Sequence, residues 1–349
     1  MKRITIKDLA EHAEVSRGTV DRVIHNRGHV APAVKLKIQR AIDELGYTPN
    51  IIARTLAQNH QHSISVLMPN PENDEFWLKP TEGIADRIKE YEAFGVNVDT
   101  YYFQNDDPQS FTCAGQRMLD AEPDAILMAC EFYQESLSLL DRIQNAGIPV
   151  VLFMTQIDHP LGENYIGQDS FQSGMMVGRL FDATISDQEL HILSINLGAS
   201  EGNTLQIKNK IRGMQSYFQD HKSFSLSKVE IINFKDEHLL KKVIDDTLFS
   251  NPSINGVIVT NSRAKYIGEI ICNHQRSREL CFIGFDLLGD NVALLNRGVL
   301  SYLINQNPYE QVGLGIKRLV DQLVFRRSVH HKSYVPLDIV IKENVAFYI

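Results

Sequence analysis

The sequence predicts a small all-α helix-turn-helix head followed by an α/β body of two doubly wound parallel-sheet lobes. Three observations lead to this fold class. The first sixty residues hold three short amphipathic segments with helix-capping signals. From Ser63 onward, apolar strand-like runs alternate with helical patterns, as in parallel sheets covered by helices. The alternation occurs in two successive series, which implies two lobes that face each other across a cleft.

Bulk composition indicates a globular protein of two or three domains. The chain has 349 residues, of which 43% are hydrophobic and 22% charged. Its four cysteines lie far apart without CxxC spacing, which argues against a disulfide framework or a zinc site. No apolar run approaches the roughly 20 residues that span a bilayer, and the N-terminal residues lack a signal-peptide core. A cytoplasmic protein without metal or cofactor is therefore expected.

Charge is unevenly distributed along the chain. Residues 1–60 hold ten Lys or Arg and six Asp or Glu, a net charge of +4. The whole chain carries −8, so residues 61–349 carry −12. A basic head on an acidic body indicates that only the head meets a polyanion, although this enrichment in cations is moderate and chance is the alternative.

Capping signals place three helices in the head. Thr5 and Asp8 form a capping-box pattern with Asp in place of Glu, ahead of the first helix. Ser16 is a good N-cap for the second helix, which has an apolar stripe on one side. A third helix is expected over about residues 32–45, with proline near its first position and Gly46 at its end. Two short helices joined by a tight turn and braced by a third form a helix-turn-helix.

The second of these helices is the candidate DNA reader. In a helix-turn-helix, this helix enters the major groove and presents its N-terminal residues to base edges. Arg17 and Arg22 suit that role because a guanidinium pairs in bidentate fashion with guanine O6 and N7. Gly18 has no side chain and would allow close approach of the backbone, whereas Asp21 would repel phosphate, orient an arginine or accept from cytosine. The alternative is a generic packing unit with a solvated arginine face.

The head closely resembles that of the LacI/GalR transcription regulators over residues 4–57. The resemblance rests on TIKDLA, on VSRGTVDRV as VSxxTVxRV, and on GYTPNIIARTLA as GYxPNxxAxxLA. It implies that positions 17, 18 and 22 read bases and that position 21, usually a serine, holds a phosphate. Asp21 and Gly18 depart from that pattern, as do Glu14 at a usual turn glycine and Ala31 at a usual cap. The candidate DNA-binding residues are Thr5, Ser16, Arg17, Gly18, Thr19, Asp21, Arg22, His25, Asn26, His29, Asn50, Ala53 and Leu56.

A linker helix that folds against DNA is expected after the head. The segment NIIARTLAQ, residues 50–58, follows Pro49 and would be marginal as an isolated helix in water. By the resemblance, Leu56 is a wedge in the minor groove, and Ala53 lets two hinge helices of a dimer approach. A disordered tether is the alternative. The predicted domains are residues 1–49, a linker over 50–62 and a body over 63–349, and a homodimer is expected because one helix-turn-helix contacts few base pairs.

The body resembles, more weakly, the type I periplasmic-binding-protein fold of the same regulators. The clearest signature is residues 283–323, with Asp286 and Gln306 at positions that usually hold sugar hydroxyls. A carboxylate accepts from two vicinal hydroxyls, and an amide both donates and accepts. Other candidates lie near expected strand ends, where such folds bind ligands. The candidate effector-binding residues are Asn70, Phe76, Trp77, Glu131, Thr155, Gln156, Gln168, Asp169, Asn203, Lys210, Asn261, Asp286 and Gln306.

Several candidates depart from the sugar-binding pattern. Met154–Thr155 replace a frequent Asp-Arg pair, Lys210 stands where arginine is common, and Asn261–Ser262 replace an Asn-Asp pair. Trp77 is a candidate platform for the apolar face of a sugar, and the alternatives are that it plugs the cleft or packs on a dimer face. The expected effector is a small polar molecule such as a sugar, a sugar derivative or a phosphorylated sugar.

These patterns predict a sequence-specific DNA-binding transcriptional regulator that is not an enzyme. A repressor is the commoner outcome in the family, and the effector bound between the lobes would control operator affinity. A serine hydrolase is the alternative, because GASEG at residues 198–202 matches G-x-S-x-G after a strand. A nucleophile elbow runs straight into its helix, whereas Asn203 and Thr204 extend the loop here.

Overall fold

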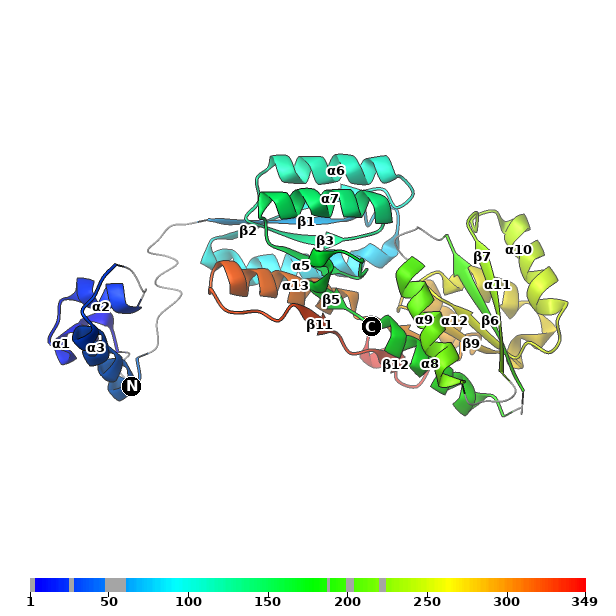
Figure 1. Cartoon of the computed structure of the whole chain (residues 1–349). Helices are drawn as coiled ribbons and strands as arrows, with labels where there is room; N and C mark the ends of the chain where they lie inside the picture. Colours follow the sequence, from blue (N-terminus) through cyan, green and yellow to red (C-terminus); the bar gives the residue numbers. More distant parts are fainter. Residues whose placement is uncertain (1–3, 25–27, 48–60, 187–188, 199–203, 220–223) are drawn as a thin grey trace. The chain divides into compact units, whose positions relative to one another are not determined.

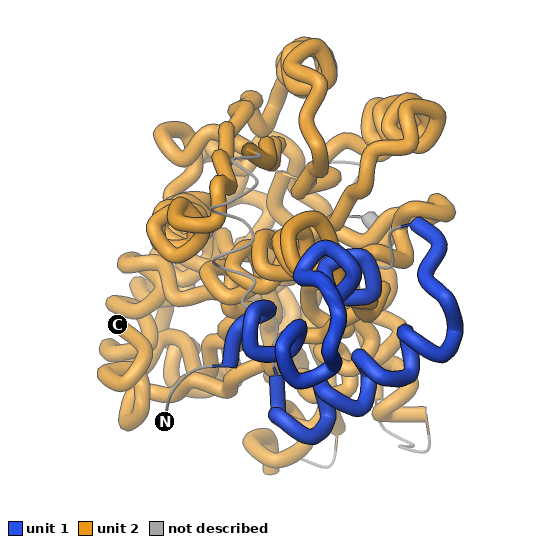
Figure 2. Tube along the Cα trace, turned by 90° about the vertical axis from the view of Figure 1, so that its left-hand side faces the viewer, with its two compact units in different colours: residues 1–59 blue, residues 60–349 orange. Residues whose placement is uncertain are grey.

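The computed structural model describes residues 4–24, 28–47, 61–186, 189–198, 204–219 and 224–349. The chain divides into two compact units, Met1–Asn59 and His60–Ile349, which Figure 2 distinguishes by colour. The first unit contains the head and the second contains the body. The division falls inside the segment predicted as a linker, of which residues 50–60 lie outside the described residues.

The head consists of α1 (Ile6–His12), α2 (Arg17–Ile24) and α3 (Pro32–Leu45). The predicted capping box is confirmed: Thr5 Oγ1 accepts from Asp8 N at 3.3 Å, and the Asp8 carboxylate accepts from Thr5 N at 2.7 Å. Ser16 Oγ accepts from the N–H of Thr19 at 3.1 Å and so caps the start of α2. Gly46 ends α3 with a φ of 60°. These caps fix where each helix begins and ends.

The turn between α1 and α2 departs from the usual glycine. Glu14 has a φ of 52°, a region that is strained for a residue with a Cβ atom. Ala31 precedes α3 without a side-chain capping hydrogen bond. A small apolar core nevertheless holds the three helices together. Its buried members are Leu9, Ala10, Ala13, Val20, Ile38 and Ala41.

The first lobe is a parallel six-stranded sheet in the order β11-β5-β4-β3-β1-β2. Its strands are β1 (His62–Pro69), β2 (Val96–Phe103), β3 (Ala125–Ala129), β4 (Val150–Phe153), β5 (Tyr165–Gly167) and β11 (Lys332–Tyr334). Its helices are α5 (Leu78–Tyr91), α6 (Pro108–Asp120), α7 (Tyr133–Ala146) and α13 (Pro308–Leu323), with short 3-10 turns η1 (Glu75–Trp77), η2 (Glu92–Phe94) and η3 (Pro160–Glu163). Helices α5 and α13 cover one face and α6 and α7 the other, over separate apolar cores (Figure 1).

The second lobe repeats this plan with the order β12-β10-β9-β8-β6-β7. Its strands are β6 (Leu190–Leu197), β7 (Phe224–Ile231), β8 (Gly256–Val259), β9 (Cys281–Phe285), β10 (Tyr302–Asn305) and β12 (Asp338–Val340). Its helices are α8 (Ser170–Thr184), α9 (Thr204–Tyr217), α10 (Glu237–Ile244), α11 (Ala264–Cys272) and α12 (Gly289–Asn296), with short turns η5 (Asp245–Phe249), η6 (Gln275–Arg278) and η7 (Val345–Phe347). The edge strand β12 is antiparallel to β10. The second sheet is therefore parallel except for this edge strand, whereas the sequence predicts a parallel sheet throughout.

The chain passes between the lobes after β5, after β10 and after β11. As a result, α13 completes the first lobe and β12 completes the second, although both come late in the sequence. Asn307 in the second passage has a φ of 53°, and its Nδ2 donates to the carbonyl of Pro336 in the third at 2.9 Å. Two of the passages are therefore hydrogen-bonded to each other.

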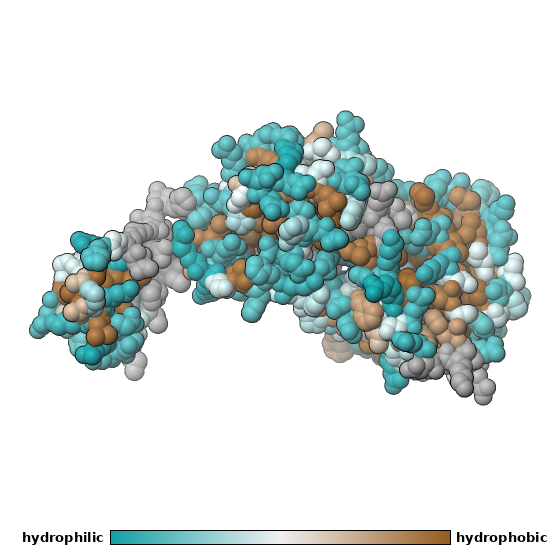
Figure 3. All heavy atoms as spheres, viewed as in Figure 1, coloured by the Kyte–Doolittle hydropathy of each residue, from teal (hydrophilic) through white to brown (hydrophobic). Residues whose placement is uncertain are grey.

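The face of each unit that is visible in Figure 3 is largely hydrophilic, with hydrophobic residues interspersed. Across the described ranges, none of the helices combines the length and apolar character needed to cross a membrane. Within the same ranges, no three His, Cys, Asp or Glu side chains gather as a potential metal site.

Candidate functional site

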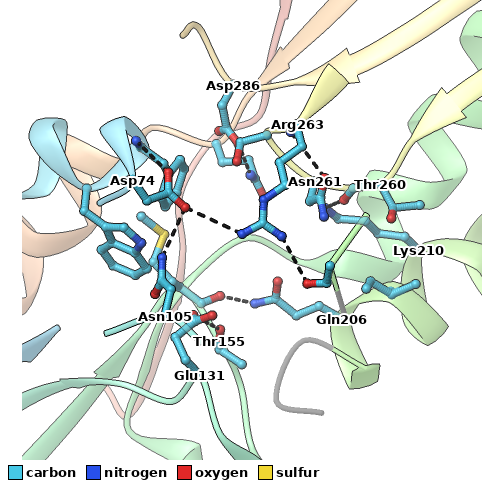
Figure 4. Close-up of a pocket in the computed structure, with 17 residues that line it drawn as sticks. Asp74, Asn105, Glu131, Thr155, Gln206, Lys210, Thr260, Asn261, Arg263 and Asp286 are labelled. Carbon is cyan, nitrogen blue, oxygen red and sulfur yellow. Dashed lines mark hydrogen bonds and ion pairs between the residues drawn. The ribbon is translucent and has the colours of Figure 1, made fainter. Parts of the chain in front are cut away.

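A pocket lies between the two lobes of the body, where the carboxyl ends of their strands meet. Its walls come from segments that follow β1 to β4 in the first lobe, and from α9 and the segments after β6, β8, β9 and β10. Figure 4 shows these side chains converging. The lining residues are Asp74, Phe76, Trp77, Asn105, Glu131, Met154, Thr155, Gly198, Gln206, Ile207, Lys210, Thr260, Asn261, Ser262, Arg263, Asp286 and Gln306.

Asp286 is held at the end of β9 with one oxygen uncommitted. The residue is 2% exposed and has a φ of 65°, which turns the chain sharply after the strand. Its Oδ2 accepts from Gln306 Nε2 at 2.7 Å. Its Oδ1 is buried and has no hydrogen-bond partner among the described residues. A buried acceptor without a donor is unfavourable, so this atom suits a donor supplied by a ligand.

Lys210 of α9 is the buried cation of the pocket. Its Nζ donates to the carbonyl of Thr260 at 2.9 Å and lies 3.6 Å from the centroid of the Phe285 ring. Burial lowers the pKa of Lys210 to about 8, and the Asp286 charge opposes that shift. Burial raises the pKa of Asp286 to about 7, and Lys210 opposes that shift. The pocket therefore disfavours both charges, and each charge supports the other.

The close contact of α8 with α9 sets the position of Lys210. A Cβ atom at Gly174 would lie 1.9 Å from the carbonyl oxygen of Lys210, and one at Gly213 would lie 2.0 Å from that of Phe171. Only glycine at both positions lets the two helix backbones approach this closely. The glycines of the helix pair thus bring the Lys210 side chain to the wall of the pocket.

A series of hydrogen bonds connects the first two passages between the lobes with residues that line the pocket. The Gln168 amide donates to the side-chain oxygen of Gln306. Gln311 of α13 donates to the carbonyl of Gln306 at 2.8 Å and accepts from the N–H of Met154 at 3.0 Å. The Met154 carbonyl in turn accepts from Gln206 of the second lobe. Side chains of both lobes and of the passages between them are therefore linked.

The pocket contains eight of the thirteen residues predicted for the effector: Phe76, Trp77, Glu131, Thr155, Lys210, Asn261, Asp286 and Gln306. Trp77 is only 3% exposed and packs edge-to-face on Phe76 and Phe153. It therefore lies mainly in the core of the first lobe and offers little of its ring as a platform for a sugar.

Four predicted residues lie away from the pocket wall. Asn70 Oδ1 accepts from the N–H of Glu72 at 3.0 Å and shapes the turn after β1. Asp169 caps α8 by accepting from two backbone N–H groups at 3.0 Å. Gln168 is buried against Gln306, and Gln156 is not part of the lining. The predicted Asn203 lies outside the described residues, as do residues 199–202 of the GASEG segment.

The sequence patterns did not select the other lining residues, among them the polar residues Asp74, Asn105, Gln206 and Arg263. Asp74 and Asn105 follow β1 and β2, and Asn105 Nδ2 donates to Asp74 Oδ2 at 3.1 Å. Gln206 lies one turn before Lys210 on α9, and Arg263 comes two residues after Asn261. The spacing of Gln206 and Lys210 was a usable signal, because residues four apart lie on one side of a helix.

The head presents a second candidate site on α2. Residues 17, 18, 21 and 22 lie on one side of this helix, away from the buried Val20. Arg17, Gly18 and Arg22 are exposed and Asp21 is half-buried. Thr5 and Ser16 act in the helix caps, Thr19 hydrogen-bonds with Ser16 at 2.8 Å, and His29 is exposed. The predicted His25, Asn26, Asn50, Ala53 and Leu56 lie outside the described residues.

A helix-turn-helix with two exposed arginines, carried on a chain with a two-lobed, pocket-forming body, defines a DNA-binding transcription regulator. The family comparisons agree with this class. Residues 5–50 match the model for bacterial regulatory proteins of the lacI family, and residues 64–326 match that for the periplasmic binding protein domain. The chain therefore joins a DNA-binding domain of the lacI family of bacterial regulatory proteins to a body that belongs to the periplasmic-binding-protein domain family.

Individual relatives agree over most of the chain. The ribose operon repressor of Halalkalibacterium halodurans is 23% identical over 351 residues, which cover 97% of this chain and 96% of the relative. A structure from Bacteroides fragilis, described as a LacI transcriptional regulator, is 27% identical with a TM-score of 0.71 over 83% of this chain and 100% of that one. A periplasmic solute binding protein from Actinobacillus succinogenes with bound D-allose shares the fold, with a TM-score of 0.70 at 18% identity over 82% and 100% of the chains.

Proposed function

We propose that this regulator is a homodimeric, cytoplasmic repressor whose operator affinity is controlled by a sugar or sugar derivative bound in the body pocket. The observation that carries the effector proposal is Asp286: its buried Oδ1 has no donor within the described ranges, while its Oδ2 is held by Gln306. A hydroxyl group supplies such a donor and leaves an oxygen that can accept from a neighbour such as Lys210. A similar fold in the Actinobacillus succinogenes protein holds D-allose.

The DNA-binding part of the proposal rests on α2. Arg17 and Arg22 are exposed on the side of the helix opposite the core, in the part of a helix-turn-helix that meets base edges. Repression, as opposed to activation, is supported by a relative that is named a ribose operon repressor and that matches along almost the whole chain. Two copies would give the contact with two half-sites that useful operator specificity requires.

Thermal unfolding of the full chain against a panel of monosaccharides, polyols and sugar phosphates tests the effector proposal. A sugar present at 100 times its dissociation constant stabilises the body by about 2.7 kcal/mol. Asp286→Asn should lose this stabilisation, whereas Asn70→Ala, which changes a turn outside the pocket wall, should retain it. Equal stabilisation of both variants by the sugar would show that the sugar does not bind in this pocket.

A further inference from the structure

Two acidic residues of the first lobe face two basic residues of the second across the cleft. Asp74 Oδ2 lies 3.7 Å from Arg263 Nη2, and Glu75 Oε1 lies 3.9 Å from Lys265 Nζ. Asp74 and Glu75 lie at the start of η1, and Arg263 and Lys265 flank the first residue of α11. Opposite charges are therefore segregated between the lobes where the lobes approach each other.

Asp74 and Arg263, which we call the inner pair, are each held in place within their own lobe. Asp74 Oδ1 accepts from the N–H of Phe76 at 3.1 Å, and Oδ2 accepts from Asn105 at 3.1 Å. Arg263 Nη1 donates to the carbonyls of Leu197 at 2.8 Å and Gly198 at 3.0 Å. The guanidinium also lies 4.7 Å from the centroid of the Phe234 ring. Figure 4 shows Arg263 extended across the pocket toward Asp74.

This fixation distinguishes the inner pair from ordinary surface ion pairs. Exposed pairs contribute little because two long side chains lose rotamer freedom when they meet. Here the side chains of Asp74 and Arg263 are 21% and 25% exposed, and their own lobes already restrict them. Approach of the lobes then forms the contact at little further entropic cost.

We propose that the Asp74–Arg263 pair, assisted by Glu75–Lys265, is an ionic latch that sets the balance between open and closed arrangements of the two lobes before any effector binds. Asp74 also caps the turn that carries Phe76 into the pocket, so latch formation and the position of that ring are coupled. The regulatory meaning of the latch rests on the proposed effector control, because a ligand acts through its different affinity for the two arrangements. Asp74 and Arg263 are thus positioning residues.

The outer pair, Glu75–Lys265, is the weaker of the two, because Lys265 also contacts a second carboxylate. Its Nζ also hydrogen-bonds Asp290 Oδ2 of its own lobe at 2.9 Å, nearer than Glu75. Neutralising Asp290 should therefore release Lys265 toward Glu75 and favour closure. Neutralising Asp74 should have the opposite effect, although both changes remove one carboxylate near the same cleft. This difference in sign is specific to the latch.

Distance measurement between spin labels in the full chain, without ligand or DNA, tests the latch. One label is attached to the exposed Cys113 of α6 and the other to a cysteine introduced by Glu237→Cys on α10. Cys272→Ser removes a third site that could be labelled. Excess unlabelled protein suppresses distances between labels on two different chains. Asp74→Asn and Arg263→Met should each raise the ratio of long to short distances by about two- to fivefold, and the double variant should add nothing further. Asp290→Asn should lower the ratio, and Glu82→Gln, which loses only a contact within α5, should leave it unchanged.

Salt supplies an independent readout that a local folding defect would not reproduce. Raising the salt to about 1 M shortens the screening length to about 3 Å. The wild-type ratio should then move toward that of Asp74→Asn, and the variant, which keeps only the Glu75–Lys265 pair, should respond less. Unchanged ratios in both latch variants, or additive effects in the double variant, would overturn the proposal. These outcomes do not depend on the sugar panel, so failure of the latch and failure of the proposed effector remain distinguishable.

Discussion

The amide of Gln306 donates to Asp286 Oδ2 at 2.7 Å and joins the end of β9 to the second passage between the lobes. Because Gln306 also accepts from Gln168 of the first passage, the carboxylate proposed to meet the effector is connected to two of the three passages. A ligand that engages Asp286 would therefore act where the chain bends between lobes. Binding in the pocket would in this way be coupled to the proposed movement of the lobes.

Gln306→Ala should weaken effector binding by about 1–3 kcal/mol, because it leaves a buried acceptor on Asp286 without its donor. Isothermal titration of the full chain with the sugar found by thermal screening measures the change. Asn70→Ala is the matched control, since its amide serves a turn outside the pocket wall. Wild-type affinity in the Gln306 variant would show that the effector does not engage this carboxylate.

Asp286 should make stability depend on pH. Its folded pKa of about 7 lies above the ordinary value of 3.8, so its stabilising contribution is complete at low pH and is lost as pH rises through about 7. Lys210, with its pKa lowered to about 8, contributes in the opposite direction, and its contribution is lost as pH falls through about 8. Both contributions are therefore smallest near neutral pH.

Relative to Asp286→Asn, the wild-type body should lose on the order of 1–3 kcal/mol of stability between about pH 5 and pH 7.5. Thermal unfolding of both proteins at the two pH values measures the difference. Equal pH dependence in the two proteins would show that the carboxyl of Asp286 titrates in its ordinary range.

Gly174→Ala should destabilise the body by about 1–3 kcal/mol, because the new methyl group would meet the Lys210 carbonyl and push α8 from α9. Gly289→Ala is the control: its Cβ would meet nothing within 4 Å. Urea unfolding compares the two variants. Similar midpoints for both would mean that the helix pair can separate without loss, and that Gly174 does not fix Lys210.

Arg22→Ala should reduce operator affinity by about 1–3 kcal/mol and relax the preference at one base position. Arg40→Ala, on the exposed side of α3, supplies a control that removes the same charge from the head. Fluorescence anisotropy on operator and on random DNA separates the two roles of an arginine. Equal losses on both DNAs would make Arg22 a phosphate contact and not a base reader.

The architecture was predictable because its signals are local. The pattern of Thr5 and Asp8 gave the start of α1, Gly46 gave the end of α3, and the βα alternation gave two lobes. The short strands β5, β11 and β12 escaped prediction, because three residues carry no usable periodicity and their pairing depends on distant chain segments.

The site was predictable only in part. Asp286 and Gln306 follow strands directly, so the rule that ligands bind at strand ends selects them. Arg263 reaches the pocket through a long side chain anchored on the carbonyls of Leu197 and Gly198, which are remote in sequence. Asp169 satisfied the same strand-end rule but is used as a helix cap. Only tertiary structure distinguishes these uses of a polar residue.

An operator-binding titration with the full chain, in the presence and absence of the sugar identified by thermal screening, tests most directly whether this pocket controls DNA binding. The sugar should change the operator affinity of the wild-type protein. Asp286→Asn and Gln306→Ala should bind the operator with wild-type affinity and no longer respond to the sugar. A wild-type response that persists at the same sugar concentrations in both variants would contradict the claim that this pocket controls DNA binding.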